Sequence, residues 1–507
     1  MPHPLRAILF LALLSPLTGA QESHDHGAPE KLGKVSFPAS CSPAVQDEFN
    51  RGVALLHSFA YSLSRSAFQS VAARDPRCAI AHWGVAMTYF HPLWEPPISA
   101  TTDGAAEKEI RLAEQIGAGT ERERGLIRAL GSIFQDSVSY SLRTSQYEHA
   151  MGVVASQNKD DVEAQVFYAL ALLANVSTTD KTHTKQKQAA DLLEPLYRKY
   201  PEHPGIAHYL IHACDNAEMA QRGLAAARAY SQIAPSAPHA LHMLSHIFTR
   251  LGLWNDSIGS NLAAREAAHR LGDVGEELHA MDYLVYANLQ TGRDQEAGQV
   301  VAQLKQMSDL DRNDFKVAYA FVAMPVRYSV ERGRWSDAAA IVPPEKAPPQ
   351  VVAVALWARG LGLARTGRPD ASRAEIDRLE EIEAQLHNAG VDYWATQVAI
   401  QVKEVEAWAA QANNRQVEAA ELLGEAADQE DALEKLPVTP GPIIPAREQF
   451  GYLLLDQGQP SLALKEFQTA LSDAPGRRGA VLGLAQARRL SGSSSGGGGA
   501  SQYLQFR

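Results

Sequence analysis

Residues 446–475, AREQFGYLLLDQGQPSLALKEFQTALSDAP, decide the fold of this 507-residue chain. Small and apolar residues recur there where two packed helices touch, a glycine separates two helical stretches, and a proline ends the second. These positions are Gly451, Leu454, Gly458, Ala463, Phe467, Ala470 and Pro475. Proline lacks a backbone N–H and its ring clashes with the preceding turn, so it cannot continue a helix. The stretch therefore predicts two antiparallel helices joined by a short turn.

Weaker copies of this unit run through the rest of the chain. Gly52, Phe68 and Pro76 repeat the small, aromatic and closing positions, and another helix opens with AHWGVAMTYF around Gly84. The spacings are those of the tetratricopeptide (TPR) repeat, a helix pair of about 34 residues. Turn glycines recur at Gly252, Gly292, Gly333, Gly367 and Gly458. No strand-like alternation competes in the sequence, so we expect an all-α fold, a TPR-type α-solenoid of antiparallel helix pairs.

The first residues predict export. A short basic start at 1–6 precedes an apolar run at 7–14 that is too short to span a bilayer, and Thr18 and Ala20 are the small residues expected before a signal peptidase site. We therefore expect a signal peptide at 1–20, no membrane span, and a periplasmic or secreted protein. The polar segment at 21–40 should be flexible, and its His24 and His26 are weaker metal candidates.

Two proline clusters, at 343–349 and 437–445, interrupt the repeats. We take the first as a boundary between an N-terminal TPR-like array at 41–342, which carries a group of closely spaced histidines, and a C-terminal array at 350–490. Residues 491–507 are rich in glycine and serine and should form a flexible tail.

Charge and cysteine content narrow the function further. The formal net charge of −11 and the absence of runs of lysine and arginine argue against nucleic-acid binding. The chain has three cysteines. In an oxidising compartment Cys41 and Cys78 could form one disulfide, which would leave Cys214 as a buried thiol, although spacing alone does not fix the pairing.

Two pairs of histidines occupy the same register of successive repeats. His208 and His212 lie in HPGIAHYLIHACD, and His242 and His246 lie in PHALHMLSHIF one repeat later. The i, i+4 spacing puts both rings of a pair on one face of a helix, so two stacked helices bring four imidazoles to a common patch. The same stretch also contains His239, His279 and Asp282. The sequence thus predicts a histidine cluster on one wall of the solenoid.

Several blocks resemble an uncharacterised family of exported bacterial TPR proteins: LLHSFAY, AHWGVAMTYFHPLW, HPGIAHYLIHA, APHALHMLSHIFTRLGLW and LHAMDYLVYANLQTG. The resemblance covers roughly residues 45–295 and brings no established activity. TPR proteins in general line a concave groove with positions 2, 5, 9 and 12 of each first helix. That register implies one groove face made of His208, His212, Asp215, His239, His242, His246, His279, Asp282 and Tyr286.

Such a cluster favours a transition metal. Neutral imidazole suits zinc, copper(II), iron or nickel, and the near absence of cysteine and methionine argues against a copper(I) chaperone. Asp215 is placed to orient a ligand histidine from behind. Six histidines exceed the four ligands of an ordinary zinc site, so two metals, or one metal with spare rings, would account for them. We expect copper, zinc or iron, with His208, His212, His239, His242, His246, His279 and Asp282 as ligands.

Three function classes remain open at this point. In a metalloenzyme, Asp282, Tyr286 or a spare histidine would move protons for water or dioxygen activated by the metal. A metal-binding protein would hold the metal without turnover, and a scaffold would hold a peptide or protein partner, or an anion, in the groove. The imidazoles could also serve only as hydrogen-bonded structure.

Other motifs point to structure. His57, His82 and His91, near Trp83 and Trp94, fit packing or capping better than ligation. The sequence has no Gly-rich phosphate loop, GxSxG elbow or HExxH motif, which gives no support to nucleotide-dependent, serine-hydrolase or zincin chemistry.

Overall fold

The computed structural model describes residues 30–93, 100–135 and 138–493. These residues form α-helices and two short 3-10 helices, and no strand occurs among them. The signal peptide expected at 1–20, with His24, His26 and Trp94, lies outside the described residues, as does the tail from 494 onward. The all-α prediction is confirmed.

The helices before the histidine cluster are η1 (Pro43–Val45), α1 (Gln46–His57), α2 (Tyr61–Arg74), α3 (Ala79–Met87), α4 (Ala100–Ile116), α5 (Glu121–Gly131), α6 (Tyr140–Gln157), α7 (Val162–Ala174) and α8 (Thr184–Lys199). The cluster region and the pair after it contain α9 (Pro204–Ala213), α10 (Ala220–Ile233), α11 (Pro238–His242), α12 (Leu244–Arg250), α13 (Trp254–Leu271), α14 (Val274–Gln290), α15 (Asp294–Leu304) and α16 (Phe315–Val330). The remaining helices are α17 (Trp335–Ala339), α18 (Pro349–Arg365), η2 (Pro369–Ser372), α19 (Arg373–Asn388), α20 (Asp392–Ala412), α21 (Gln416–Asp431), α22 (Ala446–Asp456), α23 (Pro460–Asp473) and α24 (Arg478–Ser493).

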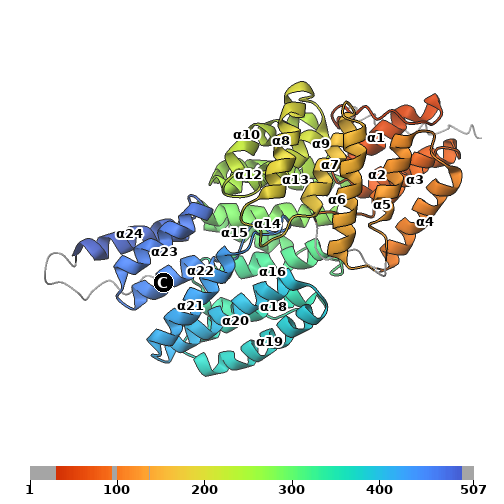
Figure 1. The fold of residues 1–507 in the computed structure, drawn as a ribbon. Helices are drawn as coiled ribbons and strands as arrows, with labels where there is room; N and C mark the ends of the chain where they lie inside the picture. The colour runs from red at the N-terminus through yellow and green to blue at the C-terminus, as the bar shows by residue number, and fades with distance from the viewer. Residues whose placement is uncertain (1–29, 94–99, 136–137, 494–507) are drawn as a thin grey trace, which may run out of the picture.

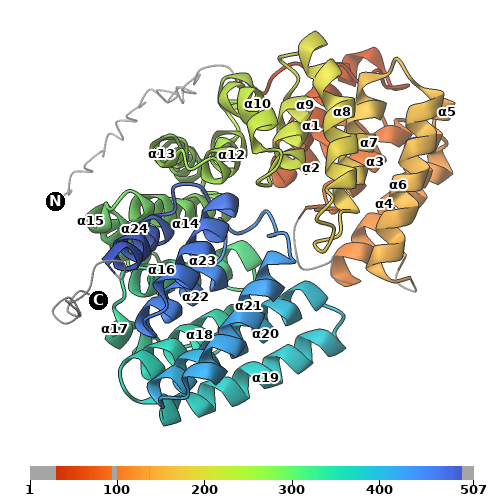
Figure 2. The same cartoon turned by 60° about the vertical axis from the view of Figure 1, so that its left-hand side comes forward.

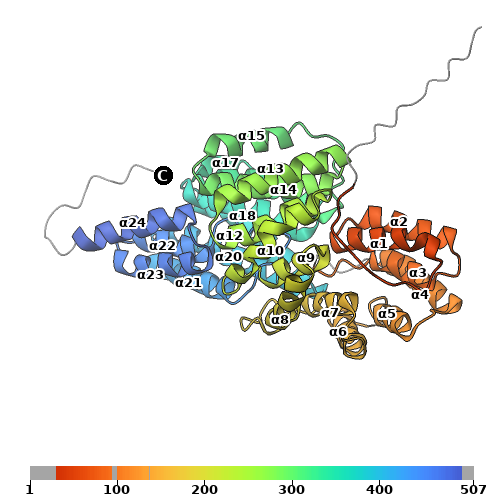
Figure 3. The same cartoon turned by 90° about the horizontal axis from the view of Figure 1, so that it is seen from above.

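Neighbouring helices in the chain pack as antiparallel pairs, and the pairs stack into a TPR-type solenoid (Figure 1). The first helices of successive pairs, α14, α16, α18 and α20, also pack side by side and form one layer (Figure 2). The N-terminal helices lie at one end and α24 at the other (Figure 3). The solenoid curves back on itself, so that its C-terminal end contacts α14, and Trp254 at the start of α13 donates its indole N–H to the carbonyl of Gly476 at 3.0 Å.

Glycines let aromatic rings sit between paired helices, which explains the sequence pattern. Phe68 is fully buried, and a Cβ built on Gly84 would lie 2.5 Å from its ring. At the C-terminal end, a Cβ built on Gly451 would lie 2.7 Å from the Phe467 ring, and one built on Gly483 would lie 2.3 Å from it. A side chain at these glycines would collide with a ring that the core cannot move freely. The repeat signature is thus a packing requirement.

The turn glycines of the sequence pattern end their helices in the left-handed region, with φ between 62° and 77°: Gly252, Gly292, Gly333, Gly367 and Gly458. Residues with a side chain rarely adopt this conformation, so glycine is the usual choice one step past a helix end. At Gly252 the neighbours add a second constraint, because a Cβ would lie 2.3 Å from the carbonyl oxygen of Pro475.

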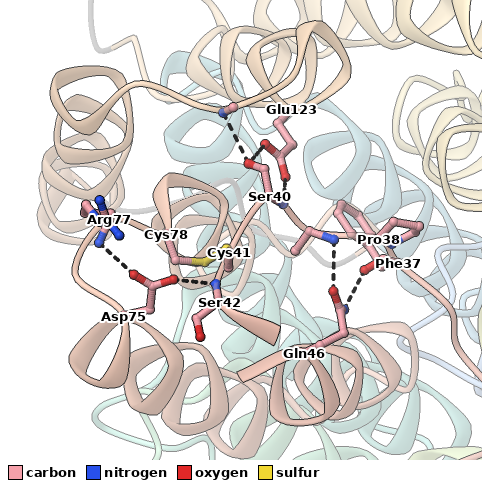
Figure 4. Close-up of a disulfide and its surroundings, with 12 residues drawn as sticks. Phe37, Pro38, Ser40, Cys41, Ser42, Gln46, Asp75, Arg77, Cys78 and Glu123 are labelled. Carbon is pink, nitrogen blue, oxygen red and sulfur yellow. Dashed lines mark hydrogen bonds between the residues drawn. A yellow bond between two sulfur atoms is a disulfide. The ribbon is translucent and has the colours of Figure 1, made fainter. Parts of the chain in front are cut away.

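The segment at 30–40 is packed, which corrects the expectation of a flexible stretch throughout 21–40. Leu32 and Phe37 are buried, and the backbone N–H of Lys34 donates to the carbonyl of Glu202 at 2.9 Å. The Cys41–Cys78 disulfide then ties this segment to the start of α3 (Figure 4). Val35 and Ala39 are partly buried against the same core, so apolar contacts add to the hydrogen bonds and the disulfide that hold this stretch.

Figure 4 also shows how the segment meets the helices around it. The backbone N–H of Ser40 donates to Glu123 Oε1 at 2.7 Å, and the Gln46 amide donates to the carbonyl of Phe37 at 2.8 Å. The third cysteine, Cys214, is a buried free thiol, and burial raises its pKa to about 12. It is therefore inert toward oxidation by ordinary thiol chemistry.

The boundary expected at 343–349 does not separate two cores. One hydrophobic cluster continues across it, from Val326 on α16 through Val351 on α18 to Leu423 on α21. The prolines break the helix but not the stacking, because α18 packs directly on α16. Proline interrupts a backbone ladder without preventing side-chain contact between the flanking helices.

The second proline cluster lies within residues 432–445, which we call the crossing segment. It leaves α21 and reaches residues far away in the chain before α22 begins. Its Glu434 N–H donates to the carbonyl of Thr178 at 2.7 Å, and Arg327 Nη1 on α16 donates to the carbonyl of Pro442 at 3.0 Å. Val438 is buried.

Among the described residues, no helix is long and apolar enough to cross a membrane.

The glycine packing gives a first test. Gly84→Ala should destabilise the protein by about 1–3 kcal/mol, because the new methyl group must displace the buried Phe68 ring. Gly259→Ala is the matched control, since that helical glycine is exposed and has nothing within 4 Å of a built Cβ. We expect a lower melting temperature for Gly84→Ala and an unchanged or slightly higher one for Gly259→Ala. Equal melting temperatures would contradict the packing account.

Candidate metal centre

Six buried histidines gather where α9, α11, α12 and α14 meet. They form two triads, and within each the candidate ligand nitrogens all lie within 4.8 Å of one another. The first triad is His208, His212 and His239, and the second triad is His242, His246 and His279. The triads adjoin, because the ring centroids of His212 and His246 are 5.8 Å apart. The structure thus brings together the six histidines that the sequence singled out.

Each i, i+4 pair points its two Nε2 atoms at each other. His208 Nε2 and His212 Nε2 are 3.1 Å apart, and His242 Nε2 and His246 Nε2 are 3.0 Å apart. The second pair keeps this geometry although α11 ends at His242 and α12 begins at Leu244. Helical spacing therefore positions both pairs, as the sequence predicted.

The protonation of His242 follows from its neighbour. Its Nδ1 lies 2.7 Å from Asn261 Oδ1, and the other end of that amide donates Nδ2–H to the carbonyl of Ser257 at 2.8 Å. A carbonyl only accepts, so the Asn261 oxygen must face the histidine. His242 Nδ1 is then the donor, and in the neutral ring Nε2 carries a lone pair.

His246 is held in the same tautomer by a carboxylate. Its Nδ1 donates to Asp215 Oδ2 at 2.8 Å. Burial alone would raise the pKa of Asp215, but Lys435 at 2.9 Å and Arg250 at 2.9 Å hold it well below its usual range, so the carboxylate is ionised. Asp215 therefore orients His246 from behind, in the position expected for it. Two Nε2 lone pairs face each other at 3.0 Å in the neutral second triad.

The first triad has similar supports. His208 Nδ1 donates to the carbonyl of His57 at 2.6 Å, which leaves its Nε2 as the acceptor atom. His239 Nδ1 lies 3.1 Å from Glu276 Oε2. Burial would raise the pKa of Glu276, but Lys316 and His239 keep it well below its usual value. In His212 the buried Nδ1 makes no hydrogen bond to any residue in the described ranges.

A third group, His57, Glu163 and His203, is a closed hydrogen-bond network. Both histidines donate Nε2–H to the Glu163 carboxylate, at 2.8 and 2.9 Å. Their Nδ1 atoms accept, from the Tyr209 hydroxyl at 3.0 Å and from the Ile206 N–H at 3.3 Å. Neither histidine keeps a free lone pair for a metal, which agrees with the structural role predicted for His57. The network instead holds His57 in place, and the His57 carbonyl accepts the hydrogen bond from His208 Nδ1.

The other histidines assigned to structure also have local partners. His82 Nδ1 lies 2.6 Å from Glu109 Oε2, and His91 Nε2 lies 3.1 Å from the carbonyl of Thr88. The His91 ring stacks on Tyr61. Neither belongs to a triad.

Asp282 and Tyr286 do not face the histidines, which corrects the ligand and catalytic roles expected for them. Asp282 is buried beside Arg327, with Nε and Oδ1 3.7 Å apart. The Tyr286 hydroxyl accepts from Arg477 Nη1 at 3.2 Å. His279 faces the cluster, so the residue one turn later on that face is Tyr283.

Tyr283 is one of the residues that sequence reasoning missed. Its ring centroid lies 4.6 Å from that of His242, and its hydroxyl is 3.5 Å from His246 Nε2. The i, i+4 spacing from His279 is a signal that could have found it. Asn261 and Lys435 carry no such signal, because Asn261 reaches the site from the paired helix α13 and Lys435 from the crossing segment.

The crossing segment covers the cluster. Lys435 Nζ contacts Asp215 Oδ2, and the carbonyl of Thr439 lies 3.3 Å from the Tyr283 hydroxyl. A cavity of about 420 Å³ lies beyond this segment, and none of the six histidines lines it. The candidate centre is therefore enclosed by protein on the side of that cavity.

Comparisons with known proteins give only distant likenesses. No family model and no curated protein matches the chain. Among solved structures it is similar to the P58(IPK) TPR domain, at 12% identity and a TM-score of 0.23, over 90% of this chain and 100% of that one. It is also similar to a human IFIT1 dimer with m7Gppp-AAAA, at 11% identity and 0.36 over 82% and 90%, and to yeast Tom70, at 9% and 0.28 over 89% and 96%. These likenesses assign no activity to the chain.

The buried imidazoles predict a pH dependence for the metal-free protein. Burial lowers the pKa of five cluster histidines in the folded state: His208, His212, His242, His246 and His279. The unfolded chain, with histidine pKa values of about 6.5, then binds more protons than the folded chain as the pH falls. The contribution of these histidines to the free energy of unfolding is fully present above about pH 6.5. Below that pH it falls, by at most about 1.4 kcal/mol per histidine per pH unit.

Melting temperatures of chelator-treated protein between pH 7.5 and 5.5 would measure this effect. His242→Gln/His246→Gln should flatten the slope, because two groups no longer need to charge on unfolding. His269→Gln/His387→Gln should leave it unchanged, since both side chains are 75% exposed. A melting temperature that rises on acidification would show that the cluster is not held neutral.

Proposed function

We propose that the protein is a metal-binding solenoid whose two triads hold two transition-metal ions, one in each. The observation that carries this is the 3.0 Å contact between His242 Nε2 and His246 Nε2, both of which bear lone pairs when the rings are neutral. Two facing lone pairs repel, and a cation between them removes the repulsion. Two ligand nitrogens at about 2.0–2.1 Å from one metal would be about 3 Å apart at an angle near 95°.

The hydrogen bonds behind the rings support the same conclusion. Metal-ligating histidines commonly donate their second nitrogen to a carboxylate, an amide or a backbone carbonyl, which fixes the tautomer and the ring orientation. His208, His242 and His246 each have such an acceptor, supplied by His57, Asn261 and Asp215. Purely structural histidines need no common orientation of their remaining nitrogens.

The donor set favours zinc or copper(II). Each triad supplies three imidazoles and neither includes a carboxylate or a sulfur ligand. Non-haem iron sites usually add a carboxylate to two histidines, and copper(I) sites prefer sulfur. Iron, although expected from the sequence as one of three candidates, therefore fits less well than zinc or copper(II).

Holding the metal is the function that this site supports best. The six histidines are buried, the crossing segment lies over them, and none of them lines the 420 Å³ cavity. Metalloenzyme chemistry is the second candidate, because three histidine ligands leave a fourth position as in catalytic zinc sites. In that case Tyr283, and neither Asp282 nor Tyr286, is placed to act beside the metal.

A peptide scaffold is the weaker alternative. A TPR protein would hold a partner against the first helices of its repeats. The crossing segment already occupies that position, since it contacts Arg327 and Tyr283 on such helices and Asp215 just after one.

We also propose a periplasmic or secreted location. The Cys41–Cys78 disulfide supports it, since such bonds persist in oxidising compartments.

Metal analysis of untagged protein with matched variants tests the proposal. We expect about two equivalents of zinc or copper in the parent and about one in His242→Gln/His246→Gln, because only the second triad is broken. His269→Gln/His387→Gln, which changes two exposed histidines, should keep both ions. The parent should melt lower after chelation, by the mass-action relation between binding and stability. A parent without stoichiometric metal and with no response to chelator would refute the proposal.

The orienting role of Asp215 has its own test. Asp215→Asn keeps the shape but removes the ionised acceptor of His246 Nδ1, so metal affinity of the second triad should fall by about 10–100-fold. The affinity of the first triad should stay within error, because its supports are His57 and Glu276. Competition titrations with a metal indicator would measure both. An unchanged affinity in the second triad would remove Asp215 from the account.

A further inference from the structure

A cavity of about 420 Å³ lies between the crossing segment and the layer of first helices, and metal binding does not use it. One face of α20 lines it at helical spacing, with Trp394, Gln397, Gln401 and Glu404. Trp357 on α18 adds a second indole. Pockets of this size, with mainly apolar walls and a few polar groups, are typical of small-molecule sites.

The basic side chains at this cavity are already paired. Lys181 Nζ lies 2.5 Å from Glu434 Oε1, and Arg250 and Lys435 both contact Asp215. Arg447 contacts Asp428, Asp431 and Glu466 on neighbouring helices. An anionic ligand would have to displace these carboxylates to reach a cation.

Two carboxyl groups at the cavity have no such partner. Glu404 is 3% exposed and accepts from Trp357 Nε1 at 2.6 Å and from the Gln449 amide. Glu430 Oε2 accepts the backbone N–H of Ala446 at 2.7 Å. Neither glutamate forms an ion pair within residues 30–93, 100–135 and 138–493. Burial raises the pKa of Glu404 well above its ordinary value and that of Glu430 to about 8.

An unsatisfied donor lines the same cavity. Trp394 is 5% exposed, and its indole N–H has no hydrogen-bond partner among the residues described. Its ring packs on Tyr393 and Phe315. Buried indole N–H groups nearly always have an acceptor, so this one points to an acceptor supplied from outside the chain.

We propose that the cavity binds a small organic amine as its ammonium ion. One of Glu404 and Glu430 gives up its proton to solvent as the ammonium binds, and the carboxylate formed supplies the counter-charge. The indole rings of Trp357 and Trp394 pack against the hydrocarbon body, and the Trp394 N–H donates to an acceptor on the ligand. Aromatic faces attract organic cations as well as hydrocarbon, so the walls and the carboxylates favour the same ligand class. The cavity lining contains no residue of either triad, and the proposal does not rest on the metal function.

Calorimetric titration of the purified full-length protein with tyramine tests the proposal, because tyramine combines an ammonium group, an aromatic body and an oxygen acceptor. Tyrosol replaces the ammonium by a hydroxyl, and 3-(4-hydroxyphenyl)propionate replaces it by a carboxylate. We expect saturable binding of tyramine and binding weaker by about tenfold or more for both analogues, since each loses a charge-assisted hydrogen bond. Equal affinities for tyramine and tyrosol, or no tyramine binding at about 1 mM, the weak end of specific affinities, would overturn it.

Variants locate the site. Glu404→Gln should weaken tyramine binding by about tenfold or more, because a neutral amide replaces the counter-charge. Glu421→Gln is the control, since that carboxylate is exposed on α21, away from the cavity lining. If Glu404→Gln fails to fold, Glu430→Gln and Trp394→Phe carry the same test with smaller changes to the core. Unchanged affinity in the folded members of this set would place the amine elsewhere and refute the proposal.

Discussion

The contact on which the site depends is the approach of two neutral imidazoles through their lone pairs, His242 Nε2 to His246 Nε2 at 3.0 Å. That arrangement is unfavourable in the absence of a cation, yet the surrounding residues hold it in place. Asn261 and Asp215 dictate the protonated nitrogen of each ring, and Lys435 and Arg250 keep Asp215 ionised. A folded protein retains such an unfavourable contact only when surrounding interactions impose it, and the metal binding that we propose would explain why they do.

The solenoid supplies the positions and the crossing segment completes the enclosure. Stacked repeats place α9, α11 and α14 beside one another, so pairs at i, i+4 meet from neighbouring helices. Lys435 arrives from a segment 220 residues away from Asp215 in the chain. The inner face that other repeat proteins leave open for a partner is here partly filled by the chain itself. The same internal segment contacts Asp215 behind the second triad and also lines the 420 Å³ cavity.

The sequence predicted what depends on local spacing. Glycine and phenylalanine at repeat positions indicated the helix pairs because Phe68 and Phe467 cannot pack unless small residues face them. The six histidines were found because i, i+4 spacing and repeat length fix which faces meet. Asp282 and Tyr286 were assigned to the histidines from the repeat register alone, but they contact Arg327 and Arg477, which come from segments that the register does not place. Asn261 and Lys435 were missed because only tertiary structure brings them to the rings. The packed stretch at 30–40 was missed because its partners, Glu202 and Glu123 among them, lie far away in the chain.

Anomalous diffraction from crystals of the metal-loaded protein, measured at the absorption edges of zinc and copper, tests the central claim most directly. The account predicts two peaks, one in each triad, with three histidine nitrogens about 2.0–2.1 Å from each. A structure at full metal loading with no peak at either triad, or with the His242 and His246 rings turned apart around a bridging water, would contradict it.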